Sequence, residues 1–138
     1  MLNNPIEKPR TETSRKLTAV MHETQEPLYD LGALQDIADG NHEFTISLVK
    51  IFLDTIPANS AEMVQACADG NWIMVSKLAH KLKSTVDMMR IKSITQDIRI
   101  IELDGKSSVS KDALPGLVNR VNQVILKASN QLREQFDL

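Results

Sequence analysis

The sequence predicts an all-α fold: an antiparallel up-down four-helix bundle with a short leading helix and a possible helical N-terminal arm. Three observations predict it. Aromatic residues make up only 4% of the 138 residues, so the core must consist of aliphatic side chains, which suits packed helices. Apolar residues recur at steps of three and four and never alternate as in a strand. The connections between these segments are short, which makes neighbouring helices antiparallel.

Residues 1–27 are predicted to form an arm outside the bundle, which spans 28–138. The first 13 residues are polar and contain Pro5 and Pro9, a composition typical of a segment that cannot bury a core. A weak apolar stripe between Ser14 and Glu26 indicates a partly helical stretch. Pro27 separates it from the bundle.

The bundle is predicted to begin with a short helix over residues 31–38, which the motif Asp-Gly-Asn at 39–41 ends. A long helix follows over 42–69, kinked or restarted at Pro57 because proline removes a backbone donor. The same motif recurs at 69–71, where Gly70 suits a left-handed helix cap. Two further helices are expected over 71–90 and 92–104. After the loop "KSSVS", Ser110 is expected to cap a last helix that continues to Phe136.

Composition excludes several classes of function. A formal charge of −2 argues against a nucleic-acid binder, which needs a basic excess. The single cysteine, Cys67, excludes an internal disulfide and fits a reducing compartment. No apolar run reaches the roughly 18 residues of a membrane span, and the N-terminus lacks the apolar block of a secretory signal. We therefore expect a cytoplasmic protein that binds neither nucleic acid nor membrane.

The segment "KLAHKLKSTVDMM", residues 77–89, places a histidine on the polar side of a helix. At about 100° per residue, the apolar residues Leu78, Leu82 and Met89 lie opposite His80 and form the core stripe. Five polar residues fall within about 60° of the ring: Ser76, Lys77, Lys83, Ser84 and Asp87. His80 is therefore predicted to be exposed near the middle of its helix. The simpler alternative is a surface histidine without a function.

The neighbours of His80 suit a ring that carries a phosphoryl group. An imidazole nitrogen attacks only when it is neutral, and free histidine has a pKa near 6.5. Lys83, one turn onward, disfavours the imidazolium form and can neutralise charge on an attached phosphoryl group. Ser84 is small and leaves the approach to the ring open, whereas Asp87 opposes the first effect of Lys83.

The residues "AHKLKSTVDMM" resemble the signature A-H-x-L-K-[GS] of histidine-containing phosphotransfer (HPt) domains. The likeness extends to "YDLGALQDIADGN" and the long helix before the motif, and it covers about residues 28–136. It implies that His80 is the phosphoacceptor, Lys83 its basic partner and Ser84 the small position. It also places Glu102, on the facing helix, near the site. The family usually has glycine ten residues after the histidine, where this chain has Arg90.

The resemblance implies a phosphorelay intermediate of two-component signal transduction. His80 would accept a phosphoryl group from an aspartyl phosphate on the receiver domain of a response regulator or hybrid kinase, and pass it to another receiver. The partner receiver supplies Mg²⁺, so this chain is expected to bind no cofactor. It is expected to act as a monomeric carrier rather than an enzyme, because it contains no nucleotide motif. The predicted docking surface comprises Ile73, Ser76, Lys77, Asp87 and Met88.

Two alternatives belong to other classes. A non-catalytic interaction bundle, or pseudo-HPt protein, would bind a receiver or kinase without being phosphorylated. A metal-binding bundle would use His22, His42 and His80. Bundle metal sites need inward-facing ligands such as Glu-x-x-His pairs, and the sequence contains none.

Overall fold

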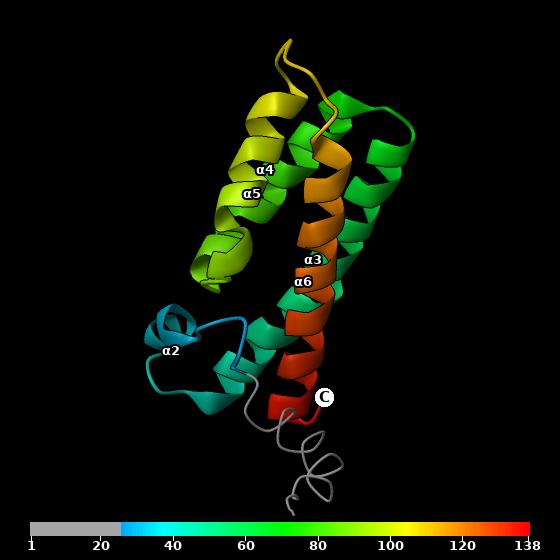
Figure 1. Cartoon of the computed structure of the whole chain (residues 1–138). Coiled ribbons are helices and arrows are strands. Elements are labelled where there is room, and N and C mark those ends of the chain that lie inside the picture. The colour runs from blue at the N-terminus through cyan, green and yellow to red at the C-terminus, as the bar shows by residue number, and fades with distance from the viewer. Residues whose placement is uncertain (1–25) are drawn as a thin grey trace, which may run out of the picture.

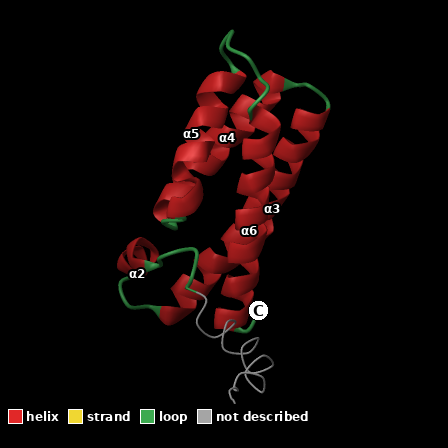
Figure 2. Ribbon diagram, viewed as in Figure 1, coloured by secondary structure: helices red, strands yellow, loops and turns green. Residues whose placement is uncertain are grey.

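The computed structural model describes residues 26–138, so nearly all of the predicted arm lies outside the described residues. Within that range the chain forms helices and no strand (Figure 2). The helices are α2 (Gly32–Ala38), α3 (His42–Ala68), α4 (Trp72–Met88), α5 (Lys92–Gly105) and α6 (Leu114–Phe136). The all-α prediction is confirmed for these residues. None of these helices is long and apolar enough to cross a membrane.

The four long helices pack side by side as a helical bundle. α3 contacts α4 and α6, and α5 contacts the same two helices, so α4 and α6 lie diagonally across from each other. Successive long helices run in alternating directions, and α2 lies beside the N-terminal end of α3 (Figure 1). α4 therefore packs mainly against α3 and α5 among the long helices, and the rest of its surface faces away from the bundle.

Each long helix contributes a buried apolar stripe to a single core. Met63 of α3, Leu82 of α4, Ile98 of α5 and Ile125 of α6 are each at most 1% exposed. Burying a side chain of this size contributes about 1.5–3 kcal/mol relative to leaving it in water. The stripes follow the helical period read from the sequence, because only that spacing keeps successive side chains on one face.

The two Asp-Gly-Asn motifs each end one helix and start the next. The Asn41 side chain accepts a hydrogen bond from the Phe44 N–H at 3.0 Å, and Asn71 accepts one from the Met74 N–H at 3.2 Å. These are N-cap contacts that satisfy donors left open at a helix start. Gly70 has φ +71° and ends α3, as predicted. Asn71 therefore fixes the point at which the helix that carries His80 begins.

Arg90 ends α4 in the same way as Gly70 ends α3. Its φ is 52°, and its N–H bonds to the Asp87 carbonyl while the Ile91 N–H bonds to the Val86 carbonyl, both at 3.1 Å. This is the left-handed cap that usually takes glycine. The arginine side chain pairs with Asp30 at 3.3 Å. Although position 90 is not a glycine, the path from α4 into α5 therefore begins in the conformation that glycine usually adopts.

Two expectations about helix ends are decided by the structure. Of the two alternatives at Pro57, a kink or a restart, the restart is excluded: α3 runs through the proline, because its buried face continues across it through Phe52, Ile56 and Ser60. Tertiary packing of that face outweighs the single lost backbone bond. Ser110 does not cap the last helix. Its hydroxyl accepts from the Asp112 N–H at 3.2 Å, a local turn that competes with capping, and α6 begins at Leu114.

Candidate functional site

α4 holds the ring of His80 out of the bundle. The apolar residues Val75, Leu78 and Leu82 on its opposite side are buried against the core, which fixes the rotation of the helix about its axis. The His80 side chain is 68% exposed. His80 lies in the middle of α4, where the backbone groups bond within the helix, so only the side chain is available for chemistry.

α5 places a carboxylate against the ring. Ile98 and Ile101 are buried in the core, and Glu102 follows on the flank of α5 that faces α4. Its side chain is only 12% exposed. A carboxylate this far from water requires hydrogen-bond donors. Two side chains of α4, His80 and Lys83, supply them.

Glu102 accepts a hydrogen bond at each of its two oxygens. Oε2 lies 2.6 Å from His80 Nδ1, and Oε1 lies 2.8 Å from Lys83 Nζ. An ionised carboxylate can only accept, so His80 Nδ1 must carry the proton. In the neutral ring the lone pair then resides on Nε2. No residue within 26–138 forms a hydrogen bond to Nε2.

The pKa of Glu102 supports this assignment of charges. The hydrogen bond from Lys83 is the main cause that lowers the pKa of this carboxyl below its ordinary value, and the bond with His80 acts in the same direction. Burial alone would raise the pKa, but it is the weaker influence overall. Glu102 is therefore ionised at neutral pH.

The described residues bring together three of the four predicted site residues. His80, Lys83 and Glu102 form one bonded group, and Ser84 is exposed one helical turn beyond the ring. Lys83 makes its contact with Glu102 rather than pointing freely to solvent. Its ammonium therefore stabilises the carboxylate that holds the ring.

The predicted docking residues differ in how far they are exposed to solvent. Ile73 is 66% exposed and Met88 41% exposed, and Lys77 is exposed as well. Asp87 pairs with Arg99 of α5 at 3.1 Å. Ser76 is only 5% exposed, so its side chain cannot serve as a docking contact. The helical wheel placed it on the solvent side correctly for an isolated helix, but α5 covers that flank of α4.

The sequence interpretation missed three residues that lie close to Glu102 in the chain, two in α5 and one at its C-cap. Leu103 is 61% exposed beside Glu102, Lys106 lines the same open hollow as His80, and Arg99 pairs with Asp87. All three lie within four residues of Glu102. A wheel drawn around Glu102 would have indicated Arg99 and Lys106, because residues three and four apart share a helix face.

No family model, curated protein or solved structure matches the chain. The candidate site therefore rests on its own geometry. Among residues 26–138 there is also no group of three or more His, Cys, Asp or Glu side chains that could hold a metal ion. His22, one of the three histidines of the metal alternative, lies outside the described residues.

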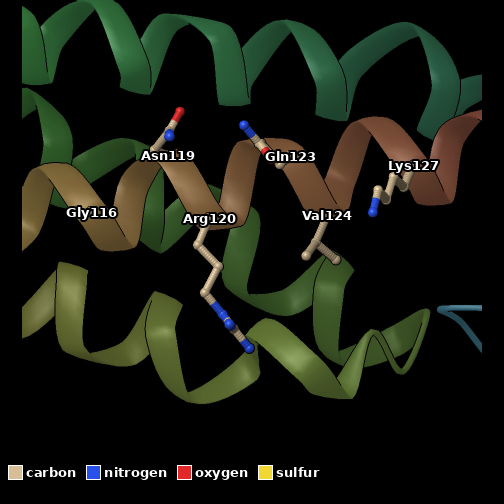
Figure 3. A pocket seen from close by; sticks show the side chains of 6 residues that line it. All are labelled: Gly116, Asn119, Arg120, Gln123, Val124 and Lys127. Atoms are coloured by element: carbon tan, nitrogen blue, oxygen red, sulfur yellow. The ribbon is translucent and has the colours of Figure 1, made fainter.

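A second hollow lies along α6 and has a different character (Figure 3). Arg120 extends from α6 toward α5, where its Nε lies 2.8 Å from Asp97 Oδ2. The two atoms lack the alignment of a hydrogen bond, so the contact is an ion pair. The arginine of this hollow is engaged in joining two helices, and no histidine lines it.

Proposed function

We propose that the chain is a phosphorelay intermediate: His80 accepts a phosphoryl group from an aspartyl phosphate on a receiver domain and transfers it to another receiver. One observation carries the proposal. An exposed imidazole has its Nδ1 held by an ionised carboxylate at 2.6 Å, which leaves Nε2 as the nucleophile. The resemblance to HPt domains supports the same residue.

The bonds made and broken in the proposed step all belong to those two proteins. Nε2 forms a bond to phosphorus while the bond from phosphorus to the aspartyl oxygen breaks, and the aspartate leaves with that electron pair. Nδ1 keeps its proton. The positive charge that develops on the ring then lies beside Glu102, which stabilises it. Transfer to the next receiver is the reverse reaction with a different aspartate.

Lys83 has two tasks in this proposal. In the resting protein it neutralises Glu102 at 2.8 Å. Its side chain is 34% exposed, and it lies three residues from His80, within reach of a group on the ring. It therefore reduces the negative charge that builds up at the site when the phosphoryl group arrives. Mg²⁺ on the partner receiver is proposed to supply the remaining charge stabilisation.

The proposal includes the architecture and the setting. We infer that α3–α6 form the four-helix bundle of an HPt domain and that α2 is its leading helix. The chain then acts in the cytoplasm as a monomer, presenting Ile73 and Met88 of α4 to a receiver. These apolar residues are exposed and would be buried on docking.

The test is transfer from a phosphorylated receiver domain to this chain. Wild type is expected to acquire a phosphate that is labile in acid and stable in base, as a phosphoramidate is, and His80→Gln is expected to acquire none. His42→Gln is the matched control, because His42 stacks on Phe136 with ring centroids 6.2 Å apart on another helix. It should be labelled like wild type.

Two results would contradict the proposal. Label that persists in His80→Gln would move the site to another residue. Wild type that binds the receiver but never acquires phosphate, with every receiver tried, would favour the non-catalytic interaction bundle.

A further inference from the structure

α4 and α5 approach each other closely where Gly105 meets the first half of α4. Gly105 is buried, and a Cβ at this position would lie 3.1 Å from the Ser76 Cβ and 3.1 Å from the Trp72 carbonyl oxygen. Both distances are shorter than ordinary van der Waals contact. The backbone of Gly105 is helical rather than left-handed. The glycine therefore serves the close approach of the two helices and not an unusual backbone angle.

A hydrogen bond fixes the register of the helices at the same place. The Ser76 hydroxyl donates to the Glu102 backbone carbonyl at 2.6 Å, and Ser76 is 5% exposed. Glu102 lies in the last turn of α5, where carbonyls lack partners within the helix. The Lys106 N–H, which would otherwise reach it, bonds to the Asp104 carbonyl. Ser76 thus joins α4 to the residue whose side chain holds the ring.

We infer that Gly105 and Ser76 are positioning residues that set the separation and register of α4 and α5, and through them the contact between Glu102 and His80. Ser76 lies one turn before His80 on α4, and Gly105 lies one turn after Glu102 on α5. The helix crossing and the 2.6 Å contact are therefore one turn apart on both helices. A displacement of α5 at the crossing moves the carboxylate away from Nδ1 by a similar amount.

The consequence is control of the tautomer of His80. Free histidine favours the Nε2–H form, which has no lone pair on Nε2. The carboxylate of Glu102 selects the Nδ1–H form, because it can only accept a proton. Gly105 and Ser76 keep that carboxylate in place. They act on the nucleophile without touching it.

The test compares Gly105→Ala with Gly116→Ala in the full-length chain. Gly116 is also a helical glycine, but a Cβ there would meet nothing within 4 Å. The readout is the ¹⁵N chemical shift of the two His80 ring nitrogens at a pH where the ring is neutral, since these shifts identify the protonated nitrogen. Wild type and Gly116→Ala are expected to show Nδ1–H, and Gly105→Ala a shift toward Nε2–H. Circular dichroism checks that each variant is folded.

Ser76→Ala is the second variant, because it removes the hydrogen bond without adding an atom. It is expected to shift the tautomer in the same direction. It decides the matter if Gly105→Ala does not fold. Wild-type ring shifts in folded Ser76→Ala and in folded Gly105→Ala would overturn the inference.

The kinetic arm rests on the proposed function and is separable from the ring shifts. Phosphotransfer to Gly105→Ala is expected to be at least about tenfold slower than to Gly116→Ala, because misplacement by a fraction of an ångström weakens catalysis strongly. If wild type is not phosphorylated but the ring shifts respond as described, the proposed function fails and the positioning role stands. If transfer proceeds and neither variant changes its ring shifts or its rate, the positioning role fails alone.

Discussion

Replacing Glu102 with glutamine changes the charge at the site while leaving its shape almost unchanged. A carboxylate accepts at both ends, and an amide accepts at only one. The two donors of the site, His80 Nδ1–H and Lys83 Nζ, lie 2.6 and 2.8 Å from the two oxygens. In Glu102→Gln one of them would face an NH₂ group. We expect Lys83 to lose its contact with residue 102, because its side chain is 34% exposed and its ammonium can hydrogen-bond to water instead.

The expected loss of rate follows from the remaining contact. The amide oxygen keeps a neutral hydrogen bond to Nδ1, worth about 1 kcal/mol, in place of a charge-assisted one of about 2 kcal/mol. The developing positive charge on the ring loses roughly that difference in the transition state. A barrier higher by about 1.4 kcal/mol corresponds to a tenfold slower step. The loss of about 1 kcal/mol therefore predicts that Glu102→Gln accepts phosphate roughly fivefold more slowly, and Glu102→Ala more slowly still.

The assay is the initial rate of transfer from one phosphorylated receiver at fixed concentration and pH. Glu62→Gln, an exposed glutamate of α3, is the matched control and should transfer at the wild-type rate. Equal rates for wild type, Glu102→Gln and Glu102→Ala would show that the carboxylate does not assist the nucleophile, and the chemical argument built on the 2.6 Å contact would be wrong.

The same variant also tests the pH dependence of stability. Because the folded-state pKa of Glu102 is lowered, the ionised group contributes stability that is fully present above its ordinary pKa of about 4.3 and is lost as the pH falls through the folded value. Urea unfolding should show Glu102→Gln less stable than wild type at pH 7, by about 1 kcal/mol. The gap should narrow in acid. A gap that is independent of pH would contradict the lowered pKa.

Two further predictions concern positions away from the bonded group. Gly70→Ala should lower the free energy of unfolding by about 1 kcal/mol because φ there is +71°, whereas Gly116→Ala should raise it by about 0.5–1 kcal/mol. Neither new Cβ meets an atom within 4 Å. Urea denaturation measures both changes, and two changes of the same sign would refute this prediction. Ile73→Asp should slow phosphotransfer at unchanged helicity. Leu126→Asp should not, because Leu126 is exposed on α6, which lies diagonally across from α4. If the two variants transfer at equal rates, Ile73 does not belong to the docking surface.

The sequence was sufficient for the elements and for the direction of His80. Both depend on spacing within one helix, and a stripe as clear as Leu78, Leu82 and Val86 leaves one rotation of α4 that buries it. The end of α3 was likewise predictable, since glycine at position 70 suits a left-handed cap. The end of α4 was not, because Arg90 is not a residue that marks such a cap.

The sequence could not predict contacts that depend on how two helices are placed against each other. The burial of Ser76 and the bond between Glu102 and His80 follow from the register of α5 on α4, which no single-helix pattern contains. Only the resemblance to HPt domains placed Glu102 near the site. The start of α6 was missed for a local reason. Ser110 has the side chain of a cap, yet its hydroxyl bonds to a backbone N–H two residues onward before the helix begins.

The location of His80 on an uninterrupted helix has a consequence for how a signal could be stored. Switch proteins usually carry a loop that orders or melts when they are modified, but the chain around His80 is regular helix on both sides, from Trp72 to Met88. Under the proposed function, modification would add mass and charge to a scaffold with no local alternative conformation. The signal would then consist of the phosphoryl group alone, and the next protein that binds at His80 would have to recognise that group directly.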